Sequence, residues 1–594
     1  MKSIIKSISS ILRVRSLIPC LFLMALVGCN GDMWDGYQLP PPLPAAAEPE
    51  PEPEPDPDYE DHPSLLTTAE ATRLETLGKT YDSSIKLLSG GTYLSTLEYV
   101  VLLFKSGEAA SVQRAELILK TIIAAQVTDE SSSHYGNWAW GINDNVGDRN
   151  PPLFFARRML GELWDLQDRM LPSMKTAYLK SCERLVTAAE RRWDVEVFAA
   201  NRAGVAYSNV YSLYVETLTL AGVRFKDSRL TQLAKDKWKV FYDNFKVHGI
   251  DEFLSRDYDN IIFNALWGIH EYVTGSQQDE ITEVMDYMYI LKMAVTHPKL
   301  YTPVVGISRD DRKYNAGNDA RSEFLKPGNT PAGYIIPDEA TNLKNNRTYP
   351  FEINGRAGSY TFTFKSYQTE KAAMGSMSGW GSYYCQQVYC MATMGTSTSA
   401  RSTLFIPGSY IHVNGFTDQK ELSTLCVYNR LPTLWHRDQW GGNQSDISST
   451  LFDFGVGLST QWIEVSSEEG KVVLNANNRG YYVYLFPYIL DNNNQIKGCS
   501  LTKVKRAKTS EKYHVEDLSF DELLFPSNAL WFGVYVKVVP ANTNVPTPEI
   551  TFKNENGVMV FSTNEGHQLK IAQKDGVSVQ VRDEDPYSKP RYYY

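Results

Sequence analysis

The hydrophobic period of this chain changes once along its length, and no other feature constrains the fold as strongly. Up to about residue 297, apolar residues recur at spacings of three and four, as at Val210, Leu213 and Tyr214. This spacing predicts helices with one buried face. From about residue 331 the period becomes two, and residues 356–366 and 530–539 are typical of strands. Helices followed by strands predict an α+β protein with two packed domains rather than an alternating α/β unit.

The first residues form a segment that we expect to be removed from the mature chain. Basic residues precede an apolar run at 17–27, which is too short to hold a protein in a membrane as a stable span. The run closes on the letters LVGC, which resemble a bacterial lipobox in which Cys29 takes up diacylglycerol. We therefore predict a lipoprotein signal peptide at residues 1–28 and lipidation of Cys29. An ordinary secretory signal with an incidental cysteine is the alternative.

Residues 29–62 have the composition of a tether. Residues 40–44 are rich in proline, and acidic residues alternate with proline at 48–58. Such a segment has little apolar surface to bury and its charges repel, so we expect it to stay extended at about 3 Å per residue. Asp32 and Asp35 follow the cysteine and resemble the export signal of surface lipoproteins in Bacteroidetes. We expect an outer membrane lipoprotein that faces the cell surface or the periplasm.

Composition narrows the partners of the folded part. The net charge of −10 argues against a nucleic-acid partner. The chain has 36 Tyr and 12 Trp, whose flat faces suit stacking on sugar rings, although β domains are rich in Tyr for packing alone. The cysteines show no metal-binding spacing. No cofactor is predicted, although the sequence leaves open whether a divalent cation neutralises charge in the site. We expect a monomer that is held at the membrane by its lipid alone.

Three short segments resemble parts of the heparinase-like polysaccharide lyases. Residues 207–211 (YSNVY) resemble a helix opening that supplies an asparagine, here Asn209. Residues 249–258 (GIDEFLSRDY) resemble a segment that ends in a tyrosine at a helix start, here Tyr258. Residues 434–438 (LWHRD) resemble a β-domain strand that carries a histidine, here His436. The three occur in the order seen in that family, although Val210 stands where some members have another histidine.

The resemblance implies a fold and an activity. The fold of that family is an incomplete (α/α) toroid followed by an antiparallel β domain. This assigns residues 63–330 to a toroid catalytic domain and residues 331–594 to a large antiparallel β-sandwich domain. The implied activity is β-elimination in an acidic polysaccharide that contains uronic acid, so the implied partner is a polysaccharide or oligosaccharide.

The chemistry of β-elimination suggests a role for each of these residues. The reaction removes a weakly acidic C5 proton beside a carboxylate that fixed donors must first neutralise. Asn209 could donate to that carboxylate, with Arg256 or His436 adding charge. Tyr258 could take the C5 proton or protonate the leaving oxygen, and His436 is the other acid–base candidate. The structural alternatives are a helix N-cap for Asn209, a core tyrosine for Tyr258 and a satisfied histidine for His436.

A long loop at residues 129–150 offers a second group of candidates. Loops of this length inside a compact domain are usually functional. Trp138 or Trp140 could stack on a sugar, with His134 and Asn137 as hydrogen-bonding partners. The alternative is that the tryptophans only anchor the loop to the core.

Two arginines fall in the connection between the helical and β halves. Arg309 and Arg312 could meet carboxylates or sulfates of a substrate. Pairing with the neighbouring Asp310 and Asp311 is the alternative.

Three functions remain open from the sequence. The first is a polysaccharide lyase that acts by β-elimination. The second is a glycoside hydrolase of the (α/α) toroid type, which needs two opposed carboxylates, and Asp144, Glu252, Asp257 and Asp259 are available. The third is a non-catalytic surface lipoprotein that binds glycan.

Overall fold

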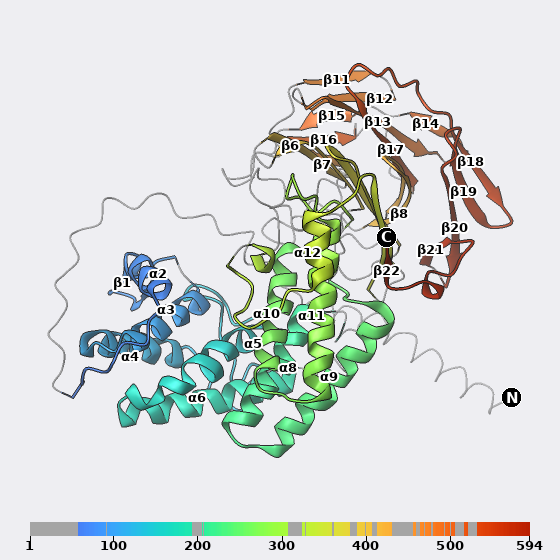
Figure 1. The fold of residues 1–594 in the computed structure, drawn as a ribbon. Coiled ribbons are helices and arrows are strands. Elements are labelled where there is room, and N and C mark those ends of the chain that lie inside the picture. The colour runs from blue at the N-terminus through green and yellow to red at the C-terminus, as the bar shows by residue number, and fades with distance from the viewer. Residues whose placement is uncertain are drawn as a thin grey trace, which may run out of the picture. The chain divides into compact units, whose positions relative to one another are not determined.

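The chain is an α+β protein in the computed structural model (Figure 1). The structure describes residues 58–90, 92–192, 205, 207–252, 254–306, 323–326, 328–358, 362–379, 389–397, 400–406, 413–430, 455–458, 464–468, 470–476, 479–491, 493–498, 501–504, 516–520, 531–575 and 577–594. Within these residues, helices extend to Asn345 and antiparallel strands begin at Phe351, apart from a small two-stranded ribbon formed by β1 (Tyr81–Asp82) and β2 (Leu87–Leu88). The order predicted from the hydrophobic period is confirmed.

The chain divides into two compact units. Unit 1 comprises Met1–Phe241 and Ala265–Thr274, and unit 2 comprises Tyr242–Asn264 and Gly275–Tyr594. Unit 2 therefore includes several helices as well as the large sheets, whereas the sequence placed every helix before residue 330 in one domain. The change from helix to strand also comes later than residue 331, because one more helix precedes the first strand of the large sheets.

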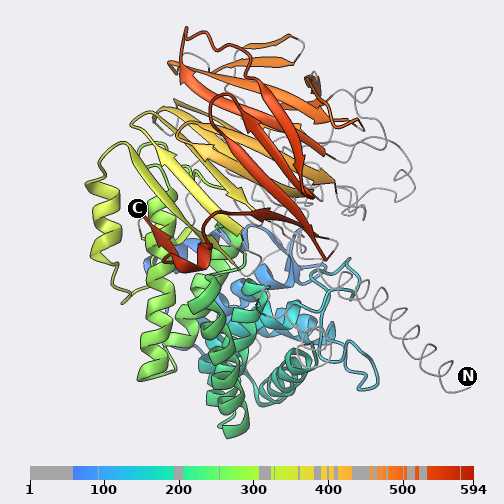
Figure 2. The same cartoon turned by 90° about the vertical axis from the view of Figure 1, so that its right-hand side faces the viewer.

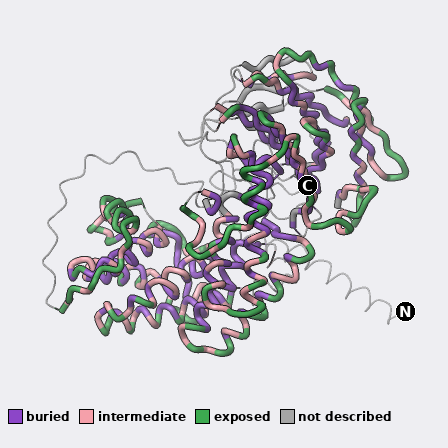
Figure 3. Tube along the Cα trace, in the orientation of Figure 1, coloured by how far each residue is buried: buried purple, intermediate pink, exposed green. Residues whose placement is uncertain are grey.

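Most of the helices bury one face, which Figure 3 shows as alternating purple and green along the coiled segments. No helix among the described residues is long and apolar enough to cross a membrane. The helical elements, in chain order, are α2 (Thr68–Gly78), α3 (Tyr93–Ser106), α4 (Ala109–Ala124), α5 (Pro151–Ala156), the π-helix η1 (Arg157–Glu162), the 3-10 helix η2 (Trp164–Arg169), α6 (Pro172–Arg191), α8 (Ser208–Arg224), α9 (Ser228–His248), α10 (Arg256–His270), α11 (Ser276–Val295), the 3-10 helix η6 (Glu323–Leu325), α12 (Asp338–Asn345) and the 3-10 helix η10 (Pro586–Ser588).

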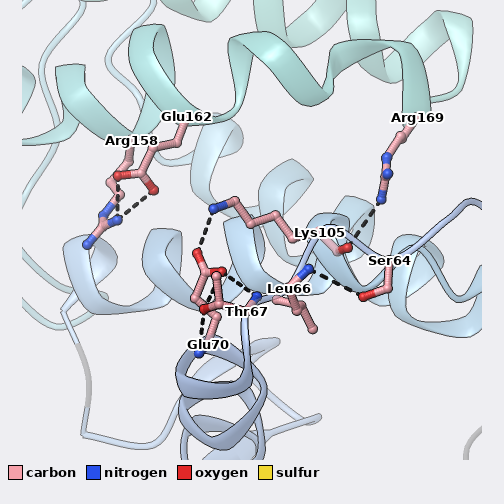
Figure 4. Close-up of polar contacts among 8 residues, drawn as sticks. All are labelled: Ser64, Leu66, Thr67, Glu70, Lys105, Arg158, Glu162 and Arg169. Atoms are coloured by element: carbon pink, nitrogen blue, oxygen red, sulfur yellow. Dashed lines mark hydrogen bonds and ion pairs between the residues drawn. The ribbon is translucent and has the colours of Figure 1, made fainter. Parts of the chain in front are cut away.

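Local sequence signals fix where the first helices begin and end. Thr67 and Glu70 form a capping box at the start of α2, with the Glu70 N–H donating to Thr67 Oγ1 at 3.2 Å and the Thr67 N–H donating to Glu70 Oε2 at 2.8 Å. Lys105, near the end of α3, forms an ion pair with Glu70 at 2.6 Å (Figure 4). Gly107 then ends α3 with a φ of 78°, a conformation that glycine adopts without steric cost.

The strands of unit 2 form three antiparallel sheets. The nine-stranded sheet has the order β15-β16-β10-β7-β6-β5-β4-β3-β22, the seven-stranded sheet has the order β11-β12-β13-β17-β9-β8 with β14 paired to β13, and the four-stranded sheet has the order β18-β19-β20-β21. Their bounds are β3 (Phe351–Ala357), β4 (Phe362–Gln368), β5 (Ala372–Ser378), β6 (Cys390–Ser397), β7 (Ala400–Ile406), β8 (Val413–Lys420), β9 (Ser423–Arg430), β10 (Gly455–Leu458), β11 (Glu464–Glu468), β12 (Lys471–Asn475), β13 (Tyr481–Leu490), β14 (Ile496–Gly498), β15 (Leu501–Val504), β16 (Glu516–Phe520), β17 (Trp531–Pro540), β18 (Ile550–Glu555), β19 (Val558–Thr563), β20 (Gln568–Lys574), β21 (Val577–Val581) and β22 (Tyr592–Tyr593).

The seven-stranded sheet lies between the other two sheets, and Figure 2 shows the long strands of unit 2 side by side. On one side, Phe416, Tyr535 and Trp531 share a core with Phe561 and Ile571 of the four-stranded sheet. On the other side, β8 meets β5 of the nine-stranded sheet, where the Thr417 N–H donates to Ser378 Oγ at 2.9 Å. Burial on both faces explains why β13 and β17 are continuous apolar runs rather than alternating ones.

A single glycine lets two of these strands pack closely. Gly533 on β17 pairs with Tyr488 on β13, and a Cβ at this glycine would lie 2.2 Å from the Tyr488 ring. Without that Cβ, the Tyr488 ring crosses β17 and its hydroxyl donates to the carbonyl of Cys426 on β9 at 2.9 Å. The absence of a side chain at Gly533 therefore makes room for a buried hydrogen bond that spans three strands.

The nine-stranded sheet has its first and last strands paired at one edge. Tyr592 and Tyr593 of β22 pair with Gly355 and Asn354 of β3. The Arg591 guanidinium lies 4.1 Å from the centre of the Phe245 ring and also forms an ion pair with Glu283 at 3.1 Å. These contacts fasten β22 to the helices of unit 2 as well as to the sheet.

Candidate functional site

The two tryptophans of the loop at residues 129–150 are anchors, so the structure corrects the prediction that either one stacks on a sugar. Trp138 is fully buried, its indole N–H donates to the carbonyl of Ile122 at 2.9 Å, and its ring packs on Phe155. Trp140 is 8% exposed, and its indole N–H donates to Asp148 Oδ2 at 2.9 Å. Neither ring has an open face, because both fill the space between α4 and α5.

Polar side chains of this loop are also buried in the protein interior. Asn137 is buried, and its Nδ2 donates to the carbonyl of Asp148 at 2.6 Å. Within the described part of the chain, three buried polar atoms of this loop have no hydrogen-bond partner: His134 Nδ1, Asn137 Oδ1 and Asn150 Oδ1. Buried polar atoms in folded proteins are nearly always paired, so these three indicate a place where a water or a ligand group would bind.

A hydrogen-bonded chain joins the end of the loop to the start of α8. The Asn150 N–H donates to Asp148 Oδ1 at 2.9 Å, and the Asn150 Nδ2 donates to the hydroxyl of Tyr207 at 3.1 Å. Tyr207 is buried and is the residue before α8. The loop and the helix start, which the sequence suggested as two separate places, therefore meet within unit 1.

Charged side chains gather at this junction, and we call Asp148, Arg149, Asn150, Arg192 and Tyr207 the Asp148 cluster. Burial raises the pKa of Asp148, and the charge of Arg192 offsets part of that rise. Burial lowers the pKa of Arg149, and the like charge of Arg192 lowers it further. Two guanidiniums thus lie within electrostatic reach of each other, and Arg192 also lies within reach of the Asp148 carboxyl group, whose pKa is raised. An anion bound beside them would relieve their repulsion.

His134 adds a titratable group to the same region. Burial lowers the pKa of the His134 imidazole, and the charge of Arg149 lowers it further. The ring is therefore neutral at pH 7, which leaves one ring nitrogen as a donor and the other as an acceptor. A neutral imidazole suits a hydrogen bond to a sugar hydroxyl better than neutralisation of a carboxylate.

Asn209 lies at the N-terminal end of α8, as predicted. It is the second residue of the helix and is 1% exposed. The N-cap position belongs to Tyr207, whose side chain makes no capping hydrogen bond, so the alternative interpretation of Asn209 as an N-cap is wrong. The first turn of a helix presents N–H groups and the positive end of the helix dipole, which adds to the positive potential of the Asp148 cluster.

Tyr258 lies at the start of α10 in unit 2, also as predicted. It is the third residue of the helix and half-buried, and its N–H donates to Ser255 Oγ at 3.4 Å, so Ser255 caps the helix. The next residue, Asp259, is buried and forms an ion pair with Lys292 at 2.6 Å, and Lys292 Nζ also donates to the carbonyl of Leu254 at 2.7 Å. Burial raises the pKa of Asp259 to about 6 although the charge of Lys292 opposes the rise. This pair holds the first turn of α10, and with it the backbone of Tyr258.

The remaining predicted residues lie outside what the structure describes. Cys29, Arg309, Arg312 and His436 are not among the described residues, and for Arg256 only the backbone, as the first residue of α10, is described. The predicted convergence of Asn209, Tyr258 and His436 on one sugar therefore stays a prediction. Across the described ranges, no group of three His, Cys, Asp or Glu side chains could hold a metal ion.

Sequence reasoning missed the residues that organise the site. Asp148, Arg149 and Asn150 directly precede Pro151 and Pro152, which begin α5. An acidic residue and an asparagine before a proline pair are a signal for a loop end that turns into a helix. Arg192 at the end of α6 gives no comparable signal, because its proximity to Arg149 arises only through the fold.

Comparisons with known proteins find likeness in structure alone. No protein-family model and no curated protein sequence matches the chain. Among solved structures, the chain is similar to the chondroitin AC lyase of Streptomyces coelicolor A3 in complex with chondroitin sulphate, at 8% identity and a TM-score of 0.37, over 86% of this chain and 85% of the lyase. A variant of the same lyase matches at 9% identity and a TM-score of 0.34, over 85% and 87% of the two chains. A β-L-arabinofuranosidase from Geobacillus stearothermophilus T6 matches at 11% identity and a TM-score of 0.23, over 79% and 86%.

Proposed function

We propose that this chain is a glycan-active enzyme that cleaves an acidic polysaccharide by β-elimination. The observation that carries the proposal is the Asp148 cluster, in which Arg149 and Arg192 lie within electrostatic reach of each other and Arg192 within reach of the Asp148 carboxyl group. A uronate carboxylate is an anion of the right charge for this place, and the orphan polar atoms of His134 and Asn137 match its neighbouring hydroxyls.

The reaction assigns a task to each part of the site. Before the C5 proton can leave, the charge of the adjacent carboxylate must be neutralised, and two guanidiniums with the positive end of α8 supply that neutralisation. Asn209 is the predicted amide donor to the same carboxylate. Tyr258 and His436 are the predicted proton carriers, and their roles rest on the sequence resemblance.

The hydrolase alternative has less support from the described carboxylates. Asp259 is committed to Lys292 in a buried ion pair, and Asp144 is an exposed loop residue. A glycosidase acid must be open to the glycosidic oxygen, which a buried and paired Asp259 is not.

An absorbance assay separates the candidate functions. β-Elimination leaves an unsaturated uronate that absorbs in the ultraviolet, so incubation with hyaluronan, chondroitin, heparin, alginate and pectate should raise the absorbance with one of them. New reducing ends without that absorbance would establish a hydrolase instead. Binding without any product would establish a non-catalytic glycan-binding protein.

Replacing Arg149 with Gln should raise KM for the acidic substrate and lower kcat/KM by about 10- to 100-fold, because a hydrogen bond to a charged group contributes about 1.5–3 kcal/mol. Arg73 is an exposed arginine on α2 that pairs with Glu98, and Arg73→Gln is the matched control, with kcat/KM expected near that of the wild type. Steady-state kinetics at two salt concentrations would measure both. Equal kinetics for Arg149→Gln and the wild type would remove the Asp148 cluster from the substrate site.

We also propose that the protein is an outer membrane lipoprotein anchored through Cys29. Replacing Cys29 with Ala should move it from the membrane pellet to the soluble fraction of lysed cells, because the acyl chains are the proposed anchor. Immunoblots of both fractions after carbonate washing would measure the change. Full retention of the variant in the pellet would show that something other than the lipid holds it there.

A further inference from the structure

A pocket lies in unit 2, lined by residues of α12, of the start of β3 and by Tyr594. Its volume is about 630 Å³, which suits one or two sugar residues. None of its lining residues was predicted as a site residue, and none belongs to the Asp148 cluster.

Two aromatic rings supply the apolar surface of this pocket. Tyr594 is 58% exposed, and its ring lies 5.6 Å from the ring of Phe351 at an interplanar angle of 43°. Exposed rings at such an angle present faces on which the C–H surface of a sugar can pack. Tyr592, which does not line the pocket, stacks on Tyr594 with ring centres 6.5 Å apart and so covers part of that ring.

Planar polar groups surround these rings. The hydroxyl of Tyr594 donates to Glu339 Oε1 at 2.6 Å, and Tyr592 also hydrogen-bonds to the Glu339 carboxylate. Asn342 and Asn346 lie one helical turn apart at the end of α12, and the Asn346 Nδ2 donates to Asn342 Oδ1 at 3.3 Å. Carboxylate and amide groups each offer two atoms in one plane, which matches neighbouring hydroxyls on a pyranose ring.

Arg347 lines the pocket and forms hydrogen bonds with neighbouring parts of unit 2. Arg347 donates from Nη2 to the carbonyl of Met293 at 2.8 Å and from Nη1 to Gln368 Oε1 at 2.6 Å. Its guanidinium lies 4.6 Å from the centre of the Phe351 ring and so fixes the orientation of that ring. Both Nη atoms of Arg347 are thus bound to protein groups, while its Nε is a buried donor without a hydrogen-bond partner among the described residues.

The charge of the pocket decides which sugars it admits. Glu339 and Glu352 are two lining carboxylates against one lining cation, Arg347, and Glu352 also forms an ion pair with Lys365 at 3.0 Å. A uronate or sulfate brought here would meet these carboxylates, whereas an uncharged sugar would accept and donate hydrogen bonds without that repulsion. We propose that this pocket binds a neutral sugar unit of a glycan, as a non-catalytic site separate from the Asp148 cluster. The proposal rests on the proposed function in one respect, namely that the protein handles glycans at all.

Direct binding measurements test this proposal. Calorimetric titration of the full chain would use neutral hexasaccharides of glucose, galactose, mannose, xylose and N-acetylglucosamine, with a hyaluronan hexasaccharide as the acidic comparison. We expect one neutral hexasaccharide to bind, with Tyr594→Ala weakening its binding at least tenfold and Asn346→Ala weakening it several-fold. Absence of binding by every neutral hexasaccharide would overturn the proposal.

Two neighbouring residues provide matched controls. Tyr593 is exposed and Asn345 ends α12, and neither lines the pocket, so Tyr593→Ala and Asn345→Ala should bind as the wild type does. Equal weakening by Tyr593→Ala and Tyr594→Ala would also overturn the proposal, as would binding of the hyaluronan hexasaccharide that Tyr594→Ala abolishes. β-Elimination of the acidic substrate should be unchanged in Tyr594→Ala, so failure of the lyase proposal and failure of this one are separate results.

Discussion

Replacing Lys292 with Met should lower the free energy of unfolding by about 3–5 kcal/mol at pH 8, because it leaves the carboxylate of Asp259 buried without its counter-charge. The pair joins Lys292 Nζ and Asp259 Oδ2 at 2.6 Å, with side-chain exposures of 1% and 6%. The same variant also removes the hydrogen bond from Lys292 Nζ to the carbonyl of Leu254. Urea unfolding followed by circular dichroism would measure the loss.

The pH dependence of this loss follows from the titration of Asp259. Its pKa is already raised to about 6 in the wild type, mainly by burial, and removal of Lys292 takes away the charge that opposes the rise. A carboxyl whose pKa is raised in the folded state costs stability as the pH rises from the unfolded value toward the folded one. The Lys292→Met variant should therefore lose little at pH 5 and progressively more toward pH 8. A loss that is constant over this range would contradict the assignment to Asp259.

Two further variants separate the buried charge from lost packing. Asp259→Asn combined with Lys292→Met removes the unpaired charge and should recover much of the stability at pH 8. Lys299 also forms an ion pair, with Glu370 at 2.7 Å, but the two side chains are 51% and 62% exposed. Lys299→Met should cause no measurable loss, because exposed pairs gain little from their attraction in water.

Replacing Tyr258 with Phe should abolish turnover of the acidic substrate, with a loss of about 100- to 10,000-fold in kcat, the range that one acid–base group contributes. The variant removes only a hydroxyl from a half-buried ring, and the cap at the start of α10 uses the backbone N–H of Tyr258 rather than its side chain. Stability and glycan affinity should therefore stay close to those of the wild type. Initial rates, melting curves and binding titrations would be measured together.

Tyr242→Phe is the matched control for this variant. Tyr242 lies on α9 in the same unit, and its hydroxyl donates to Glu283 at 2.6 Å. The control should keep its kcat within about threefold, a change of less than about 0.7 kcal/mol in the barrier. If Tyr258→Phe also keeps its kcat within that range, Tyr258 carries no proton in the reaction and the resemblance at residues 249–258 has misled the assignment.

The positions of two helix starts came from the sequence resemblance. Asn209 and Tyr258 both fall in the first turn of a helix, as the resemblance implies. The switch from helices to strands was readable from the hydrophobic period, since burial of one face imposes the period of each element on the sequence.

The sequence did not predict which side chains are buried, or which residues form ion pairs, where these depend on residues far apart in the chain. Trp138 looked like a sugar platform because its loop is long and polar, yet its ring is covered by residues from α4 and α5. Asp259 was a candidate catalytic carboxylate in the sequence, and only the packing of α11 against α10 within unit 2 pairs it with Lys292. A single sequence records which residues could be buried, whereas their partners are set by tertiary contacts.

The pairing of β22 with β3 has a consequence for synthesis of the chain. The ribosome delivers β3 before every other strand of the nine-stranded sheet and β22 after all of them. While the intervening strands emerge and form hairpins, one edge of β3 stays open, with backbone groups that could pair with another chain. Closing this long loop is slow compared with forming the local hairpins. The nascent protein therefore passes through a period in which chaperones or early contacts must protect that edge, until Tyr592 and Tyr593 pair with Gly355 and Asn354 and cover part of it.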